Sequence, residues 1–418
     1  MRTVVRSATI PLGLVLLLSV DPAVCRAQTA LTLQEAVDSA LRTRALLKAE
    51  AERVNEAEGR KQQAGLLPNP EFQFGNENLR PGQTYSRDVD TLAYVTWPLD
   101  ILGKRGQRVA VAARVVARTE AERDLLRRQV AQSVRLAYWT ARGAQERRDL
   151  LASTVTTFQR VVDYHAAQLQ AGTIAEQDVL RVRLERERIQ IAAHLASIDA
   201  VNARLALLKA IGRTDVTDLV LSEPLDTVRT PPQAPTIQEV LARRGEMKVA
   251  AASTGEAQAN IRLQDAVARP DVGVVFGYKR TQLPDALTGV NTATAAVKVT
   301  VPLFDRNQGN RSVAAAALRR QEQLQLETQT SITGDLQRAA QEYEMRRVEV
   351  ADTLQPLREH ARTISTIAQA AYQQGGLDLL RLLDAERSRL DAETAWVEGM
   401  VAFQQSLVNL EAAQGVSR

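Results

Sequence analysis

The segment TLAYVTWPLDILGKRGQRVAVAARVVARTE, residues 91–120, joins a strand-like run to the start of a very long helical pattern. Up to Trp97 the residues favour a strand, whereas from Arg105 to Gln170 apolar side chains return mostly every three or four residues. No proline occurs between Pro98 and Pro224. A helix over 105–170 would be about 100 Å long, because each residue adds 1.5 Å. The segment therefore predicts a mainly α fold with a small β part.

The helical pattern turns back on itself at glycine. Gly172 ends the long run, and a second apolar run at helical spacing returns from Leu180 to Gly212. The second half of the chain has the same order, with Gly375-Gly376 at the tip and Pro356 inside the outgoing run. We therefore expect two long helical hairpins, the second of them kinked at Pro356.

The two halves of the chain share motifs at an offset of about 203 residues, which indicates an internal duplication. Four pairs lie in register: Thr32-Leu-Gln-Glu with Thr236-Ile-Gln-Glu, Trp97-Pro-Leu-Asp with Val301-Pro-Leu-Phe-Asp, Gln170-Ala-Gly-Thr with Gln373-Gln-Gly-Gly, and Leu207 and Gly212 with Leu410 and Gly415. A proline-rich stretch, Pro224 to Pro235, joins the halves. We expect one helix–β-hairpin–helical-hairpin repeat over 28–230 and a second over 231–418.

Each repeat is expected to open with a helix and then two strands. In the first repeat, Thr32 and Glu35 form a capping-box pattern at the start of a helix that runs to Leu66. Small and branched apolar residues alternate with mostly polar ones near the end of the second β-hairpin, so that one face of this strand would meet an apolar environment and the other water. The four expected strands are 71–79, 89–97, 272–279 and 292–301.

The first 27 residues have the pattern of a secretory signal peptide. Two arginines precede an apolar run over 10–20, and cleavage is expected after Ala27. A retained membrane helix is the alternative, but this run is shorter than the ~20 residues that span a bilayer. Cys25 leaves a lipidated N-terminus open as a further alternative. Removing 1–27 takes away three arginines and one aspartate, so the formal charge falls from +4 to +2. So small an excess does not indicate a nucleic-acid partner.

The composition and motifs exclude several classes of function. Aromatic residues make up 4% of the sequence, and there is one cysteine, which excludes a disulfide framework and a cysteine-type zinc site. Motifs of the GxSxG, HExxH and phosphate-loop types are absent, so neither a catalytic residue nor a cofactor is expected. No metal site is expected, because each histidine stands alone and should lie on the surface or between helices: His165, His194 and His360.

Four strands of roughly nine residues could cross a membrane but could not close into a barrel. An open sheet edge in lipid leaves backbone groups unpaired at several kcal/mol each, so other copies of the chain must complete the wall. Two copies would give a filled eight-stranded barrel, whereas three would give twelve strands and a lumen. We therefore expect a trimer or a larger ring.

These features resemble the TolC outer-membrane efflux family over essentially the whole chain after the signal peptide. The resemblance is carried by AGLLPNPEFQFGNEN at Ala64–Asn78, WPLDILGKRGQR at Trp97–Arg108, and the glycine-tipped hairpins QAGTIAEQDVL and QQGGLDLLRLLDAER. The first two segments look most like the heavy-metal branch of the family, CzcC.

The resemblance implies a homotrimeric duct through the outer membrane, with a twelve-stranded β-barrel in lipid and a helical barrel in the periplasm. It implies a periplasmic adaptor (membrane fusion protein) and an inner-membrane RND-type pump as partners, and divalent heavy-metal cations as the first choice of cargo. A duct for drugs or other small organic molecules is the alternative. A periplasmic coiled-coil adaptor is a weaker one, because it would not need two strand pairs.

The resemblance also implies a periplasmic gate six and nine residues after each tip glycine. These positions are Asp178 and Arg181 in the first hairpin and Arg381 and Asp384 in the second. Asp384 keeps the acidic character of the family, whereas Arg381 departs from it, which favours Arg–Asp pairing across the constriction over a purely acidic ring. The alternative is that all four are ordinary charges on a solvated helix face.

The hairpin tips are expected to contact the adaptor, chiefly through Gly172, Thr173, Gly375 and Leu377. The glycines would also serve as helix breakers in a left-handed conformation. Aromatic residues on or at the ends of the strands are expected to face lipid or its interface: Phe72, Phe74, Tyr94, Trp97, Phe276 and Tyr278.

Overall fold

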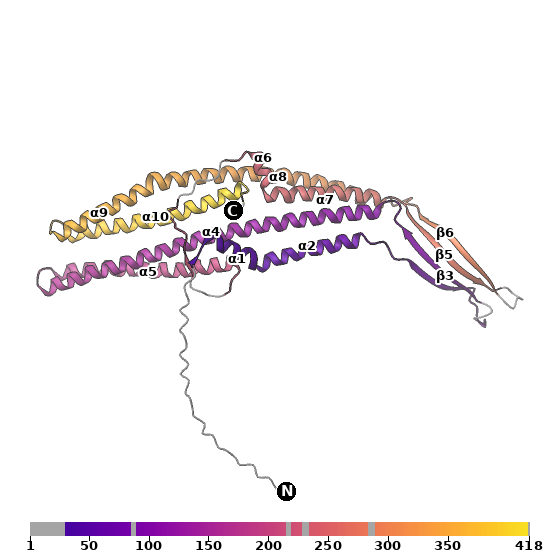
Figure 1. The fold of residues 1–418 in the computed structure, drawn as a ribbon, viewed down its shortest axis with the longest axis horizontal. Helices are drawn as coiled ribbons and strands as arrows, with labels where there is room; N and C mark the ends of the chain where they lie inside the picture. Colours follow the sequence, from indigo (N-terminus) through magenta and orange to yellow (C-terminus); the bar gives the residue numbers. More distant parts are fainter. Residues whose placement is uncertain (1–29, 85–88, 215–218, 228–233, 283–288, 417–418) are drawn as a thin grey trace, which may run out of the picture.

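The computed structural model describes residues 30–84, 89–214, 219–227, 234–282 and 289–416. The expected signal peptide, 1–27, lies outside the described residues. The molecule is long and narrow, with helical hairpins at one end and an antiparallel sheet at the other (Figure 1). This arrangement confirms a mainly α fold with a small β part.

Apart from the two-residue strands β1 and β4 and the π-helical segment that divides one helix, the described helices and strands follow the same order in both halves of the chain. The first half contains β1 (Ala30–Leu31), α1 (Leu33–Thr43), α2 (Ala45–Ala64), β2 (Glu71–Glu77), β3 (Asp90–Leu99), α4 (Lys104–Gln170), α5 (Glu176–Ile211) and β4 (Val220–Leu221). The second half contains α6 (Ile237–Arg243), α7 (Gly245–Val267), β5 (Asp271–Thr281), β6 (Val290–Thr300), α8 (Gln308–Val348), η1 (Glu349–Leu354), α9 (Gln355–Gln373) and α10 (Leu379–Ala413). The helix α4 has 67 residues and matches the predicted run within one residue at its start.

The four long strands form one open antiparallel sheet in the order β2-β3-β5-β6. All four predicted strands are present, with ends that differ by at most two residues. The hairpin of the second repeat therefore continues the sheet of the first, and β2 and β6 are the two edges. Within the described residues this sheet does not close on itself.

The single helix expected from Thr32 to Leu66 is wrong, because the chain breaks it at Arg44. Thr32 does form the predicted capping box with Glu35. Arg44, however, has an extended conformation with ψ of 119°, and a new helix starts at Ala45. The Arg44 guanidinium donates to the carbonyl oxygen of Ala210 at 3.0 Å, where α5 ends. The break thus places a cation on the last, otherwise unpaired carbonyls of another helix.

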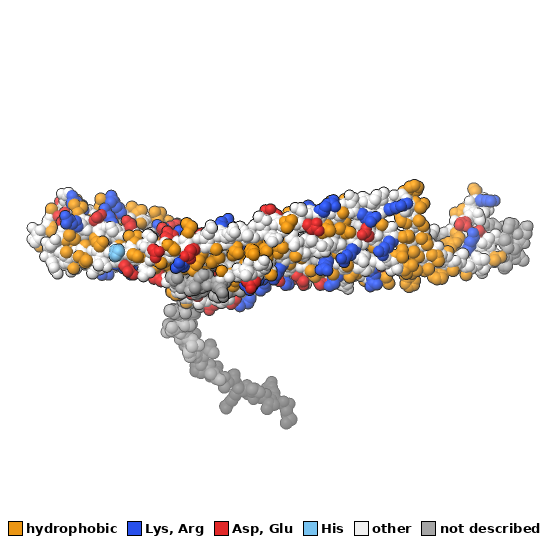
Figure 2. Space-filling view, turned by 90° about the horizontal axis from the view of Figure 1, so that it is seen from above, with side chains coloured by type: hydrophobic (Ala, Val, Ile, Leu, Met, Phe, Trp, Pro, Cys, Tyr) orange, Lys and Arg blue, Asp and Glu red, His pale blue; other side chains and the backbone are white. Residues whose placement is uncertain are grey.

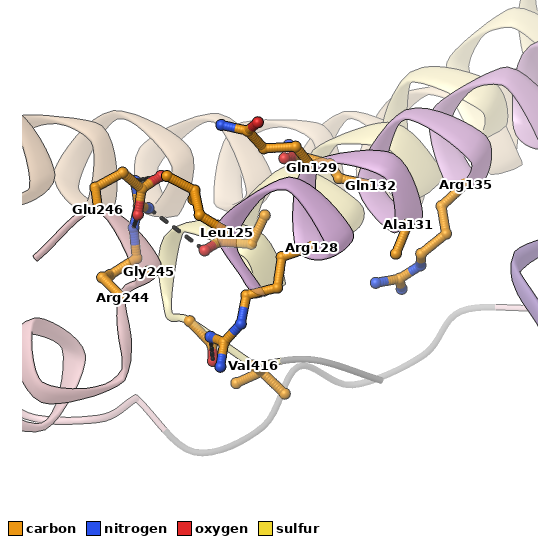
Figure 3. Close-up of a pocket in the computed structure, with 12 residues that line it drawn as sticks. Leu125, Arg128, Gln129, Ala131, Gln132, Arg135, Arg244, Gly245, Glu246 and Val416 are labelled. Carbon is orange, nitrogen blue, oxygen red and sulfur yellow. Dashed lines mark hydrogen bonds and ion pairs between the residues drawn. The ribbon is translucent and has the colours of Figure 1, made fainter. Parts of the chain in front are cut away.

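The second repeat contains an equivalent break between two helices, at Arg244. This residue also has an extended conformation, and its guanidinium donates to the carbonyl of Ala413, at the end of α10, at 3.2 Å. Arg128 of α4 reaches the same junction, where it lies close to Arg244 and Val416 (Figure 3). It donates to the Arg243 carbonyl at 2.9 Å. The short α6–α7 break and the C-terminal end of α10 are therefore held together by arginine side chains.

The outgoing run of the second hairpin is interrupted where the sequence predicted a kink. The π-helical segment η1 ends just before Pro356, whose ring nitrogen has no hydrogen to donate to the preceding turn. Val350 and Leu354 in this segment are buried against α10. The wider π turn accommodates the place where Pro356 cannot donate a backbone hydrogen bond. The run α8–η1–α9 bends there and follows α10 (Figure 1).

The main core lies in the middle of the molecule, where the two repeats meet. Phe403 and Met400 of α10 are fully buried there beside Tyr138 of α4. The Tyr138 hydroxyl donates to the Leu31 carbonyl at 2.8 Å and accepts from the Glu223 backbone N–H at 3.2 Å, which ties the segments before α1 and after α5 to the long helix.

By length and composition alone, one helix of the described chain could cross a bilayer, and that helix is α5. In the structure α5 packs antiparallel along α4 as the returning arm of the first hairpin. Ile189 and Ala196 are buried in one cluster with Leu151 and Phe158 of α4. Its apolar character is therefore used, in part, to build the hairpin.

Candidate functional site

The sheet has one continuous apolar face, which the strand register defines. Paired residues on neighbouring strands share a face. One row crosses all four strands as Phe72, Val95, Phe276 and Ala295, and neighbouring rows contain Phe74, Trp97 and Tyr278. The apolar side chains of this face are largely exposed in the single chain; Phe72 is 69% exposed and Val297 68%. A face of this kind needs an apolar medium around it.

The opposite face of the sheet is mostly polar, although Leu92, Val275 and Ala296 also lie on it. One row contains Gln73, Tyr94, Gly277 and Thr294, and the next rows contain charged and hydroxyl side chains such as Lys279 and Thr292. Tyr94 therefore lies on the other face from the remaining predicted lipid-facing aromatic residues, and its grouping with them is wrong. A Cβ at Gly277 would lie 2.1 Å from the Tyr94 ring, so the ring occupies the space above this glycine.

A small charged cluster marks the polar face near the loops between strands. Lys279 binds Glu77 at 2.9 Å and lies 3.9 Å from Asp90. Asp90 is buried and accepts hydrogen bonds from the Asn78 side chain at 2.9 Å and from the Gln282 backbone at 2.7 Å. The cluster joins the ends of both β-hairpins, which sequence reasoning did not predict.

The two hairpin tips have the same backbone design. Gly172 and Gly375 are left-handed, with φ of 72° and 76°, and a Cβ at either would meet nothing within 4 Å. The N–H groups of Thr173 and Gly376 bond back to carbonyls five residues earlier, so each tip closes as a Schellman motif. The glycines are confirmed as helix breakers. Thr173 is exposed, whereas Leu377 packs against a small apolar cluster of α9 and α10.

The predicted gate residues lie on the first turns after the tips, and the single chain does not bring them together. Arg381 pairs with Asp378 of its own helix at 3.6 Å, and both side chains are mostly exposed. Asp384 and Arg181 are exposed and Asp178 is half-buried. Among the described residues of one chain, no ion pair joins Arg381 or Arg181 to Asp384 or Asp178. Pairing across an axis between chains stays a prediction.

Two contacts near the tips tie the hairpins together, and sequence reasoning missed both. His165 of α4 is buried, with Nδ1 2.7 Å from the Val161 carbonyl and Nε2 2.6 Å from the Tyr372 hydroxyl of α9. Because a carbonyl only accepts, Nδ1 carries the hydrogen and Tyr372 donates to Nε2. His165 thus lies between helices, as expected, whereas His194 and His360 are exposed.

The second contact is an ion pair between α5 and α10. The Arg387 guanidinium binds the buried Glu185 carboxylate in a two-pronged fashion, with Nε 2.8 Å from Oε1. Hydrogen bonding to Arg387 lowers the pKa of Glu185, and burial opposes this shift. The two residues are 202 positions apart, close to the repeat offset, so the pair joins equivalent helices. That spacing is the only sequence signal that could have suggested it.

The outer membrane efflux protein family model matches this chain over residues 36–213 and 236–416. The chain belongs to this family. Its relatives include the cobalt-zinc-cadmium resistance protein CzcC of Cupriavidus metallidurans, which is 24% identical over 92% of this chain and 90% of that protein. Another is the cation efflux system protein CusC of Escherichia coli, 24% identical over 81% of this chain and 75% of that protein.

Solved structures of outer-membrane channels share the fold of this efflux protein. A CusC structure has a TM-score of 0.75, with 18% identity over 91% of each chain. The Campylobacter jejuni CmeC outer membrane channel has a TM-score of 0.76, with 17% identity over 92% of this chain and 85% of that one. The efflux protein is therefore a TolC-type channel of the outer membrane with its helical part in the periplasm. Its family and structural neighbours are channel proteins, not enzymes.

Proposed function

We propose that this efflux protein is the passive outer-membrane duct of a tripartite system that exports divalent heavy-metal cations. The observation that carries the proposal is the open sheet with one apolar and one polar face at the end of two long helical hairpins. The apolar face would meet lipid, the polar face would line a hydrated lumen, and the hairpins would continue that lumen through the periplasm. The names of CzcC and CusC support metal cations as the cargo.

A homotrimer would complete the duct. The edge strands β2 and β6 each offer one unpaired row of backbone groups, and three chains would join these edges into twelve strands. The wider proposal includes cleavage after Ala27, the repeats 28–230 and 231–418, and lipid contact around the barrel. An adaptor would bind at the tips, through Gly172, Thr173, Gly375 and Leu377, and an RND-type pump would supply the energy.

The cargo can be tested in cells that lack this protein but keep the neighbouring pump and adaptor. We expect such cells to lose tolerance to cobalt, zinc or cadmium salts and to regain it with the intact gene. Unchanged metal tolerance together with lost tolerance to drugs would contradict the metal assignment and favour the duct for organic molecules. A loss of neither would contradict export itself.

The gate can be tested by single-channel conductance. We propose that Asp384 and Arg381 of one chain pair with Arg181 and Asp178 of a neighbour when the periplasmic end is closed. Asp384→Ala should raise the closed-state conductance, because it removes one partner of an ion pair in a narrow pore. Asp391→Ala is the matched control, since this exposed aspartate lies two turns further along α10. An unchanged closed-state conductance in Asp384→Ala would remove Asp384 from the gate.

A further inference from the structure

The segments that lead from strand to long helix form two equivalent bends, which we call elbows. The first elbow spans 99–105, directly after Pro98, and the second spans 301–311, which includes the equivalent Pro302. Each elbow has one left-handed residue just before its helix, Gly103 with φ of 78° and Asn307 with φ of 57°. The role of this repeated motif does not follow from the duct alone.

The inner side of each elbow is fixed by polar contacts. In the first, Lys104 binds Asp271 at the start of β5 at 2.7 Å, and Arg269 donates to the Leu102 carbonyl at 2.7 Å. In the second, the buried Asn307 donates to both the backbone and side-chain oxygens of Gln264 of α7 at 2.9 Å. These contacts fix the backbone of each elbow and thereby the positions of the side chains on its outer side.

The outer side of each elbow presents large apolar side chains to the surroundings. Phe304 is 92% exposed, the highest value among the exposed large hydrophobic residues, and Leu303 and Ile101 are about two-thirds exposed. Leu66 and Leu67, at the end of α2, are more than half exposed as well. Hydrophobic side chains gather where the helices meet the strands (Figure 2). A fixed, exposed set of this kind indicates a binding surface.

This surface continues the apolar face of the sheet. The residues Trp97 and Leu99 lie on that face, and Ile101 follows two positions later in the chain. Val297 and Val299 also lie on it, and Val301 and Leu303 follow directly after the end of β6. Basic side chains lie on the helices next to it (Figure 2). Arg306 is exposed, and no hydrogen bond or ion pair of its guanidinium is found within the described part of the chain. Aromatic and basic residues together are typical of a lipid headgroup interface.

We propose that the two elbows insert into the periplasmic leaflet of the outer membrane, with Phe304, Leu303 and Ile101 among the acyl chains and Arg306 at the lipid phosphates. The proposal rests on the chain being an outer-membrane channel. The elbows would set the depth of the barrel in the bilayer. Anionic phospholipid is the favoured partner, because Arg306 supplies an unpaired positive charge.

The proposal can be tested with spin labels on the exported channel in phospholipid vesicles. The sequence has one native cysteine, Cys25, which the expected cleavage removes. A nitroxide is placed at Phe304→Cys or Ile101→Cys and, as a control, at Met345→Cys, which is 72% exposed on α8. We expect collisions with a water-soluble nickel complex to be severalfold rarer at the elbow sites than at 345, and collisions with oxygen to be more frequent.

Two outcomes would overturn the proposal. Nickel collisions at the elbows as frequent as at 345 would place them in water, and rare collisions with both reagents would show that a second copy of the chain covers them. The measurement needs neither pump nor metal cargo, so a failure of metal export in cells would leave it unaffected.

Arg306 is tested in the same labelled channel. We expect Arg306→Glu to raise nickel collisions at the Ile101→Cys label in vesicles with phosphatidylglycerol and to change them less in neutral phosphatidylcholine. Arg319→Glu, at an exposed arginine further along α8, should have no such effect. Equal responses of Arg306→Glu in both lipids would overturn the assignment of Arg306 to the phosphates.

Discussion

Buried carboxylates of the helical hairpins pack against basic side chains of neighbouring helices. Glu185 pairs with Arg387, and Glu393 is held by Arg358 and Arg362. Burial raises the pKa of Glu393, and the two arginines outweigh it, so its pKa is lowered. Removing one partner of such a buried pair lowers the stability of the fold more than removing one partner of an exposed pair, because the remaining charge stays buried and unpaired. These pairs fix how the helices meet.

The Glu185–Arg387 pair predicts a dependence of stability on pH. The folded-state pKa of Glu185 is lowered, so its contribution is complete above the ordinary glutamate pKa, about 4.3, and is lost as pH falls through the lower folded value. The midpoint of thermal helix loss, followed by circular dichroism in detergent, should fall with pH in this acidic range. Glu185→Gln should lower the midpoint at neutral pH and weaken its acid dependence. An acid dependence identical to that of the unmodified protein would contradict the assignment.

The charged residues show where sequence reasoning ends. Charged residues make up 24% of the chain, and nothing local separates Glu185 or Arg387 from the others. Their pairing depends on how two helices from different repeats lie against each other. The gate positions Asp384 and Arg381 could be named only through a family resemblance, and one chain cannot show whether they meet across an axis.

Two helical glycines, Gly399 and Gly334, differ in how closely a neighbouring helix approaches them, so the effects of replacing them by alanine can be compared. A Cβ at Gly399 of α10 would lie 2.1 Å from the Leu354 side chain of η1, whereas a Cβ at Gly334 of α8 would meet nothing within 4 Å. Gly334→Ala should stabilise the helix by about 0.5–1 kcal/mol, because alanine is the better helix former. Gly399→Ala should destabilise by about 1–3 kcal/mol, because Leu354 is packed in the core and cannot easily move.

The two glycine variants are compared by thermal or denaturant unfolding under one condition. Opposite signs are the expected result. Equal stabilisation by both alanines would mean that α10 and η1 can separate without cost, and that the π segment does not fix their contact.

Helices and strands could be predicted from the sequence where the residues that determine them lie within the segment itself. The spacing of apolar residues predicted the strands and the 67-residue helix, and the positions of glycine and proline predicted the hairpin tips and the interruption near Pro356. The break at Arg44 could not be foreseen, because the helical pattern continues through it and its cause is distant. The carbonyls at the end of α5, 166 residues away, attract the Arg44 side chain. Tyr94 was misplaced for a related reason: the strand register, and not its aromatic character, decides its face.

At the scale of the whole molecule, the open sheet makes one strand a direct probe of the assembled duct. On β6, neighbouring residues belong to opposite faces: Thr294 shares the polar row of Tyr94, and Ala295 shares the apolar row of Phe276. In the single chain both are exposed. Closure into a barrel would leave Thr294 in water and place Ala295 against lipid.

Single-cysteine variants distinguish these states by their reaction with a membrane-impermeant maleimide in intact outer membranes. We expect Thr294→Cys to react and Ala295→Cys to be protected, since the reagent reaches the hydrated lumen and does not enter the hydrocarbon core. Adding denaturant should make both react, which controls for the presence of the thiol. Equal labelling of the two cysteines in membranes would mean that both faces of β6 meet water, as in an unclosed sheet. Reversed labelling would mean that the face of Ala295 lines the lumen and the face of Thr294 meets lipid. The assignment would then be reversed for the whole strand, because side chains alternate strictly between the two faces.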